Sequence, residues 1–323
     1  MDEDPIDCLP PGVVLARDAD AAGIGRDALR RAVGSGRLVR ARPGAYVRAA
    51  EWSRATPEDR HLMAVRAAAR QLADPVFSHE SAAAVWGLPL VAAPEGVHVL
   101  GPVGPQHRSR GTGTRAGVTR HAARRGVEVV ERAGLRVTGV VDTVLAVARS
   151  RDLRRSLAVA DAAVRAGLVP ASLLRQEAAR LAGVPGARRA RLVAGLADGR
   201  AESAGESVSR ARIHLDGFAQ PDLQVPFVRR GQHVARVDFW WPGAGPGVVG
   251  EFDGRKKYRV DGVDDRRSLE ERVWAEKRRE DRLRSAGLTV VRWTWREAWG
   301  PGPLSALLRD AGVPRRAPGA GNC

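Results

Sequence analysis

Apolar positions near the N-terminus recur at helical spacing and then change to strand-like alternation. They predict a short helix over Arg17–Ala22, a turn at Gly23 and a second helix over Arg26–Val33. Within the second helix, Leu29 and Val33 stand four residues apart and are expected to face the core together. Two short helices joined by a tight turn are typical of a helix-turn-helix.

The next segment has the period of a strand pair. Residues Leu38–Val47 alternate apolar and basic side chains around Pro43-Gly44, which predicts a hairpin with a tight turn at its tip. Together with the preceding helices, this hairpin predicts a winged helix-turn-helix. The region is also strongly basic, because the stretch from Arg26 to Arg48 holds seven arginines and a single acidic residue.

The middle of the chain is rich in alanine and mixes both periods. Helical spacing begins near Pro57 and continues through the string SHESAAAVWGLPL. In that string a helix-capping role for Ser78 explains the pattern, and His79 is assigned no catalytic role. Strands are expected at Val97–Leu100, Val127–Glu131 and Leu135–Val137, and helices at Val140–Ser150, Ala158–Ala166, Ala171–Leu181 and Arg188–Leu196.

The C-terminal third predicts a helix, three strands, a second helix and a final strand. The leading helix is expected around Glu202–Leu215 and is followed by a strand pair. The expected strands are Leu223–Val228, Val234–Phe239, Val248–Phe252 and Leu288–Trp293, and the second helix is Ser268–Ala286. The sequence therefore predicts an α/β multidomain protein with a winged helix-turn-helix (1–56), a mixed α+β middle lobe (57–150), a helical connector (151–199), an α/β sheet domain (200–312) and a disordered tail (313–323).

Composition indicates a polyanionic partner. Among 323 residues, 53 lysines and arginines outnumber 37 aspartates and glutamates, which gives a formal net charge of +16. Such an excess is typical of nucleic-acid binders, while an arginine-rich genome would also raise the basic count. The clustering of arginines between Arg26 and Arg48 favours the first explanation.

The cysteines and the apolar runs restrict the cellular setting. Cys8 and Cys323 lie near opposite ends of the chain, which excludes a disulfide framework and a thiolate zinc site. The first residues are acidic and proline-rich, and no uncharged apolar run approaches about 18 residues. We therefore expect a cytoplasmic protein with no membrane partner.

Three carboxylates lie close to the predicted C-terminal strands. Asp238 closes one strand, and Glu251 and Asp253 lie in the next, so the sheet is expected to bring all three to one edge. Mg²⁺ prefers carboxylate oxygens together with water and phosphate oxygens. The arrangement therefore predicts a site that holds Mg²⁺ or Mn²⁺ against a scissile phosphodiester bond.

These C-terminal strings resemble a known nuclease superfamily. The EFDG string, the REDRLRSAG helix and the VVRWTW strand, in this order, resemble the very-short-patch-repair endonuclease branch of the PD-(D/E)XK restriction-endonuclease-like superfamily. The resemblance implies a restriction-endonuclease-like fold for residues 200–312. It implies that Asp238 and Glu251 bind the metal and that Glu206, on the leading helix, is an outer carboxylate for the same or a second cation.

The chain departs from that superfamily at one position. The superfamily's lysine normally stands where this sequence has Asp253, and the narrower branch places a histidine at the position of Lys257. The resemblance thus implies that Asp253 is a supporting acid and that Lys257 stabilises charge on the phosphate. Arg255 and Lys256, in the same basic run, are expected to contact DNA.

The N-terminal half resembles the AbiEi-type antitoxin and transcription-regulator family. The strings that carry the resemblance are GIGRDALRRAVGSGRLVRARPGAYV and SHESAAAVWGLPL. A winged helix-turn-helix domain that binds DNA places its second helix in the major groove and its wing near the DNA backbone. The resemblance implies DNA contacts by Arg26, Arg30 and Arg31 on the helix and by Arg40 and Arg42 on the wing.

Two functions follow from the sequence. In the first, the protein is a Mg²⁺-dependent DNA endonuclease that a winged helix delivers to DNA. In the second, it is a regulator of antitoxin type whose nuclease-like domain is catalytically inactive. DNA is the expected partner in both, and a second copy of the chain and a cognate toxin are further candidate partners.

Overall fold

The protein is a mixed α/β multidomain chain with several sheets. The computed structural model describes residues 6, 9–101, 113–115, 117–124, 126–229, 232–243, 247–254, 281–285 and 287–317. The chain divides into two compact units, of which the first combines Met1–Arg151 with Leu168–Ala194 and the second combines Asp152–Gly167 with Gly195–Cys323. The division into five segments that the sequence analysis predicted is finer than these two units and stays a prediction.

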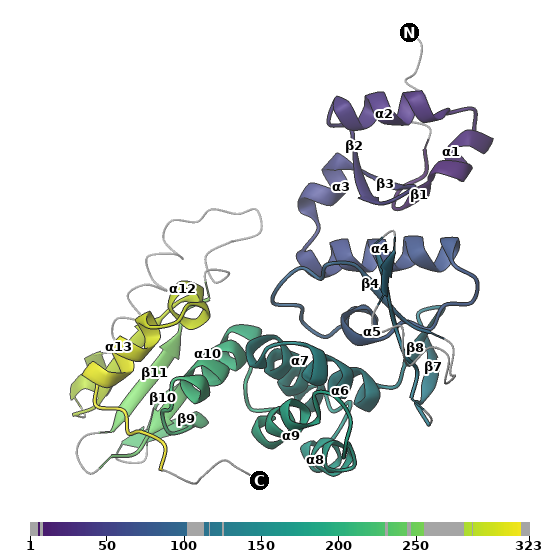
Figure 1. Ribbon diagram of the computed structural model, residues 1–323. Helices are drawn as coiled ribbons and strands as arrows, with labels where there is room; N and C mark the ends of the chain where they lie inside the picture. The colour runs from purple at the N-terminus through teal and green to yellow at the C-terminus, as the bar shows by residue number, and fades with distance from the viewer. Residues whose placement is uncertain are drawn as a thin grey trace. The chain divides into compact units, whose positions relative to one another are not determined.

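The N-terminal module of the first unit, residues 9–54, contains the two predicted helices and the predicted hairpin. Its elements are β1 (Val14–Leu15), α1 (Ala16–Ala21), α2 (Arg26–Gly34), β2 (Leu38–Arg42), β3 (Ala45–Arg48) and α3 (Ala49–Arg54), and its antiparallel sheet has the order β1-β3-β2 (Figure 1).

One inward-facing residue of α2 was predicted wrongly. Leu29 is buried as expected, but Val33 is 36% exposed, and Ala32 is buried instead. Leu29 and Ala32, three residues apart on α2, lie in the same core cluster. The small side chain of Ala32 lets α2 approach the sheet closely.

The rest of the first unit builds a second core. Helices α4 (Pro57–Gln71), α5 (His79–Val85), α6 (Val140–Ser150), α8 (Ala171–Ala179) and α9 (Ala187–Leu196) accompany a sheet of order β4-β6-β5 and a β7-β8 hairpin. The strands are β4 (Val97–Leu100), β5 (Gly113–Arg115), β6 (Val118–His121), β7 (Val129–Arg132) and β8 (Leu135–Thr138). Phe77, Val97, Val99 and Val137 are fully buried at the centre of this core.

Helix α4 begins with a capping box that the sequence carries in its first turn. The hydroxyl of Thr56 accepts a hydrogen bond from the backbone N–H of Asp59, and the Asp59 carboxylate accepts one from the N–H of Thr56. Such a box satisfies two backbone donors that helix geometry leaves without partners. The capping box thereby fixes the residue at which α4 begins.

The second unit is built on a four-stranded sheet of order β12-β11-β10-β9. Strands β9 (Asp222–Arg229), β10 (Gln232–Trp241) and β11 (Val248–Phe252) are antiparallel neighbours, and β12 (Thr289–Trp293) runs parallel to β11. Helix α10 (Ala204–Leu215) lies beside this sheet in Figure 1, and the described part of the unit also contains α7 (Leu153–Arg165), α12 (Trp295–Trp299) and α13 (Pro303–Asp310). The described elements follow the predicted order of a helix, three strands and a final strand, and most of the second predicted helix, Ser268–Ala286, lies outside the described residues.

Helix α10 is held by close packing and by a buried ion pair. A Cβ atom added to Gly205 would lie 2.0 Å from the ring of Phe252, so glycine is needed for the approach of α10 to β11. On its other side, Arg210 donates to Asp161 on α7 at 2.6 Å, and both side chains are buried. Burial of a charge without its partner is costly, so this pair fixes α10 against α7.

Two sequence expectations for the second unit need correction. Asp238 does not close its strand, because β10 continues for three residues to Trp241. Residues Pro314 and Arg316, expected to be disordered, instead make backbone hydrogen bonds to Ala219 and Gly217. No helix among the described residues is both long and apolar enough to cross a membrane.

Candidate functional site

Helix α2 presents its arginines to solvent. Arg26, Arg30 and Arg31 are all exposed, because Leu29 and Ala32 turn the opposite face of the helix toward the core. Arg30 donates to Asp27 at 2.5 Å, and both side chains of this pair are more than three-quarters exposed. An ion pair this exposed contributes little to stability, so Arg30 can exchange it for another anion at small cost.

The two arginines of the β2–β3 hairpin that were predicted to bind DNA differ in their exposure to solvent. The pairing register shifts between Arg40 and Arg42, which marks a β-bulge in β2. A bulge turns the following side chain away from the direction that regular alternation would give it. Arg40 is exposed, whereas Arg42 is half-buried and burial lowers its pKa.

Arg255 and Lys256, which were also predicted to contact DNA, lie outside the described residues.

The C-terminal carboxylates Glu206 and Asp238 meet through a shared amide. Gln224 Nε2 lies 3.1 Å from Glu206 Oε2 and 3.4 Å from Asp238 Oδ1, and it donates to both. The second oxygen of Asp238 accepts the backbone N–H of Phe252 at 3.0 Å. Elements α10, β9, β10 and β11 therefore converge on these two side chains.

Both oxygens of Glu206 are engaged at the start of α10. They accept from the hydroxyl of Ser203 and from the backbone N–H of Glu202, each at 2.8 Å. Burial and the nearby Asp238 raise the pKa of Glu206 above its usual value, while these hydrogen bonds act in the opposite direction. A cation at this position would favour the ionised form of both carboxylates.

The structure gives fewer contacts for the other residues of the predicted metal site. Glu251 is buried in β11, and Asp253 lies just beyond the strand, where its backbone N–H donates to the carbonyl of Trp293. Lys257 lies outside the described residues. Within the part of the chain that the structure describes, no group of three or more histidine, cysteine, aspartate or glutamate side chains is arranged to hold a metal ion.

A cluster of histidines in the first unit was missed by the sequence analysis. His61 on α4, His79 on α5, His98 on β4 and His121 on β6 gather around Glu80 and Arg151, and they are four of the seven histidines in the chain. The ring of His79 stacks on that of His121 with centroids 3.6 Å apart. Glu80 forms an ion pair with Arg151 and lies 3.6 Å from His98 Nε2.

The hydrogen bonds of this cluster fix the tautomer of His98. Arg151 lies 3.2 Å from His98 Nε2, and because a guanidinium only donates, that nitrogen accepts. The proton of neutral His98 is therefore on Nδ1, which donates to His121 Nε2 at 2.8 Å. Ser81 connects the cluster to α4, because its hydroxyl contacts His61 Nε2 at 3.0 Å and accepts the backbone N–H of His98.

The buried setting keeps these imidazoles neutral near pH 7. Desolvation is the largest of the causes that lower the pKa of His61, His98 and His121 to about 4, and the charge of Arg151 contributes to the shift of His98. The pKa of His79 is lowered well below its usual range for the same reason. Only the SHES string marked this region in the sequence, since the other three histidines come from separate elements with no common spacing.

The neutral cluster predicts that the first unit loses stability in acid. The folded-state pKa values of about 4 lie below the unfolded value of about 6.5, so the unfolded chain binds more protons between these limits. Stability is fully present above pH 6.5 and falls as the pH decreases toward 4. Hydrogen-exchange protection factors of peptides covering α5 and β4 should drop between pH 7.5 and 5.5 by about tenfold for each histidine that gains its proton only on opening.

The substitution His98→Asn removes one titrating group and should make this pH dependence shallower, whatever it does to stability at pH 7.5. Equal protection factors at pH 7.5 and 5.5 in the wild-type protein would contradict this interpretation of the cluster.

Comparison with known proteins finds a similarity within the N-terminal module. The family model described as transcriptional regulator, AbiEi antitoxin, matches residues 11–49, which contain α1, α2 and the whole hairpin. Two uncharacterized proteins from Mycobacterium tuberculosis strains CDC 1551 and H37Rv are each 40% identical to this chain over 100 residues, or 31% of this chain. The alignment spans only 37% of each relative. The expected resemblance to the AbiEi family is thereby confirmed for residues 11–49.

Proposed function

We propose that this protein is a DNA-binding transcriptional regulator of the antitoxin type and that residues 9–54 are its winged helix-turn-helix. The observation that carries the proposal is the exposed arginine face of α2, which lies within the segment that matches the regulator family. A cognate toxin and a second copy of the chain stay predicted partners.

The proposed mode of binding follows from the two faces of α2. Leu29 and Ala32 hold the helix on its sheet, and the arginines on the outer face enter the major groove. A guanidinium there donates two parallel hydrogen bonds to guanine O6 and N7 or binds a phosphate. Arg40, exposed on the hairpin, contacts the DNA backbone and fixes the orientation of the helix.

The substitutions Arg26→Ala and Arg31→Ala should each weaken DNA binding by about tenfold, since one good arginine contact contributes roughly 1–3 kcal/mol. The measurement is fluorescence anisotropy with a labelled duplex at several salt concentrations. If a side chain contacts phosphate, its loss should also reduce the slope of log affinity against log salt by about one.

The matched control is Arg175→Ala, because Arg175 is an exposed helical arginine on α8 in the same compact unit. It removes the same charge and should leave both affinity and salt slope nearly unchanged. Equal losses from Arg31→Ala and Arg175→Ala would show that only net charge matters and would contradict a specific role for α2.

A second candidate function is favoured by the carboxylate pair in the second unit. Glu206 and Asp238 share the amide of Gln224, and the pKa of Glu206 is raised mainly by burial and also by repulsion from the charge of Asp238. A divalent cation would offset this repulsion and would supply a water of lowered pKa for phosphodiester hydrolysis. In this proposal Asp238 and Glu251 bind Mg²⁺ or Mn²⁺, and Glu206, Asp253 and Lys257 support them.

Nicking of supercoiled plasmid in the presence of Mg²⁺, Mn²⁺ or EDTA tests the nuclease candidate. The substitution Asp238→Asn should abolish metal-dependent nicking, and Gln224→Leu should reduce it by about 10- to 100-fold, as loss of a residue that orients a ligand usually does. Asp222→Asn, at an exposed acid on β9, is the control and should leave the rate unchanged. Absence of nicking by the wild-type protein, or an equal rate in Asp238→Asn, would leave the regulator as the sole function.

A further inference from the structure

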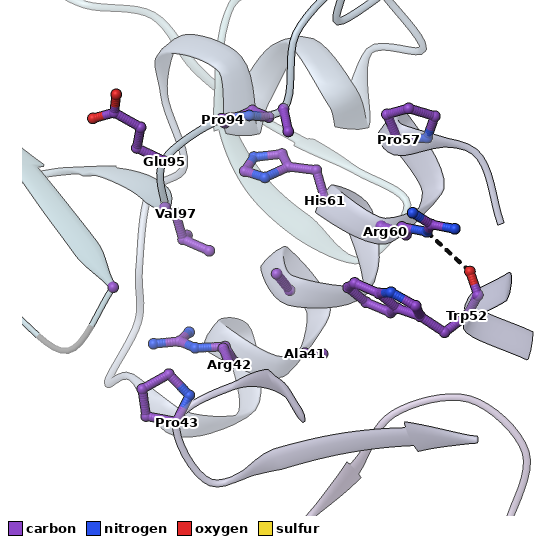
Figure 2. A pocket seen from close by; sticks show the side chains of 14 residues that line it. Ala41, Arg42, Pro43, Trp52, Pro57, Arg60, His61, Pro94, Glu95 and Val97 are labelled. Atoms are coloured by element: carbon purple, nitrogen blue, oxygen red, sulfur yellow. Dashed lines mark hydrogen bonds between the residues drawn. The ribbon is translucent and has the colours of Figure 1, made fainter. Parts of the chain in front are cut away.

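A pocket lies between the β2–β3 hairpin and the start of α4 within the first unit. Its volume is about 430 Å³, which falls in the range of small-molecule sites. Figure 2 shows Arg42 and Pro43 from the hairpin on one side, His61 from α4 on another and Trp52 from α3 nearby. The opposite wall comes from the segment of residues 93–97 that leads into β4.

The walls of this pocket combine apolar surface with one flat aromatic face. Ala41, Ala64 and Val97 line it together with three prolines. The guanidinium of Arg60 lies 5.4 Å from the centre of the Trp52 ring, and its Nε donates to the carbonyl of Trp52 at 2.9 Å. The Trp52 ring is therefore held in place by Arg60, which suits stacking against a planar ligand.

The charges at the wall favour an anion. Arg42 and Arg60 contribute two cations, whereas the acid on the lining is Glu95, which is exposed. Burial lowers the pKa of Arg42, so its guanidinium is partly desolvated where the β-bulge has turned it inward. A partly desolvated guanidinium binds a carboxylate more strongly than an exposed one does, because little water remains to be displaced.

The base of the pocket is preorganised. His61 is buried and neutral near pH 7, and its Nε2 is bound to the hydroxyl of Ser81, which also accepts the backbone N–H of His98. A neutral imidazole offers a polar contact without a further charge. This hydrogen-bond chain ties the base of the pocket to the buried histidine cluster, so a ligand would find a fixed surface.

We propose that this pocket binds a small planar carboxylate, which stacks on Trp52 and pairs with Arg42, and that its occupation weakens DNA binding. The binding site stands on the pocket alone, while the effect on DNA rests on the proposed function. The carboxylate neutralises Arg42 and so removes one positive charge near the tip of the hairpin that carries Arg40. DNA phosphates near that hairpin are then attracted less strongly, and by linkage DNA weakens the ligand to the same degree.

The first experiment measures ligand binding without DNA. Saturation-transfer NMR on the full chain uses indole-3-carboxylate and salicylate as probes and indole-3-carboxamide as the uncharged counterpart. Saturable transfer from the two carboxylates is expected, and it should weaken by about tenfold in Arg42→Gln, in Trp52→Ala and with the carboxamide. Arg54→Gln, at an exposed arginine on α3, removes the same charge and should bind like the wild type.

Trp52→Ala removes a large side chain and can destabilise the fold, whereas Arg42→Gln is a milder change, so the test depends mainly on Arg42→Gln. Arg42→Gln retains a polar side chain of similar length, and equal thermal unfolding of Arg42→Gln and the wild type would confirm that its fold is intact. Absence of saturable binding by either carboxylate, or equal binding by wild type and Arg42→Gln, would overturn the ligand site.

The second experiment measures DNA affinity with and without saturating indole-3-carboxylate. A decrease of roughly fivefold or more is expected, as is usual for coupled sites, and Arg42→Gln should abolish it. Unchanged or increased affinity in the presence of bound ligand would overturn the coupling. Failure of the protein to bind DNA at all would contradict the proposed function while leaving the ligand measurement valid.

Discussion

Packing of Leu29 and Ala32 against the three-stranded sheet is the contact on which the rest of the N-terminal module depends. It decides that one face of α2 is apolar and buried, so that Arg26, Arg30 and Arg31 all stand on the outside. Burial of a leucine side chain contributes about 1.5–3 kcal/mol, which exceeds what the exposed Arg30–Asp27 pair offers. The orientation of the helix is therefore set by its core face, and the arginine face is left available for a polyanion.

Because of the β-bulge in β2, Arg40 and Arg42 point in different directions. Arg40 stays on the outer surface, whereas Arg42 turns into the pocket beside Trp52 and His61. From His61 the contacts continue through Ser81 to His98 and the partly buried ion pair of Glu80 with Arg151. The surface proposed to contact DNA and a largely buried polar network thus lie on the two sides of one short strand, so a ligand bound in the proposed site would contact the hairpin directly.

The sequence predicted the order of elements well because that order follows from local periodicity and turn residues. It failed where tertiary contacts decide: Val33 is displaced from the core by Ala32, and the bulge after Arg40 breaks regular alternation. The histidine cluster could not be predicted, since its members come from four elements. Gln224 was missed for a similar reason, because its role depends on two acids brought together from α10 and β10.

Methylation interference on a bound duplex tests most directly the claim that α2 reads the major groove. Methyl groups at guanine N7 occupy the major-groove edge that an arginine would contact, without altering the phosphates. If α2 enters the major groove, methylation at a few guanines within the bound site prevents complex formation by the wild-type protein, and this effect disappears in Arg26→Ala or Arg31→Ala. Binding that is indifferent to guanine N7 methylation at every position would contradict it.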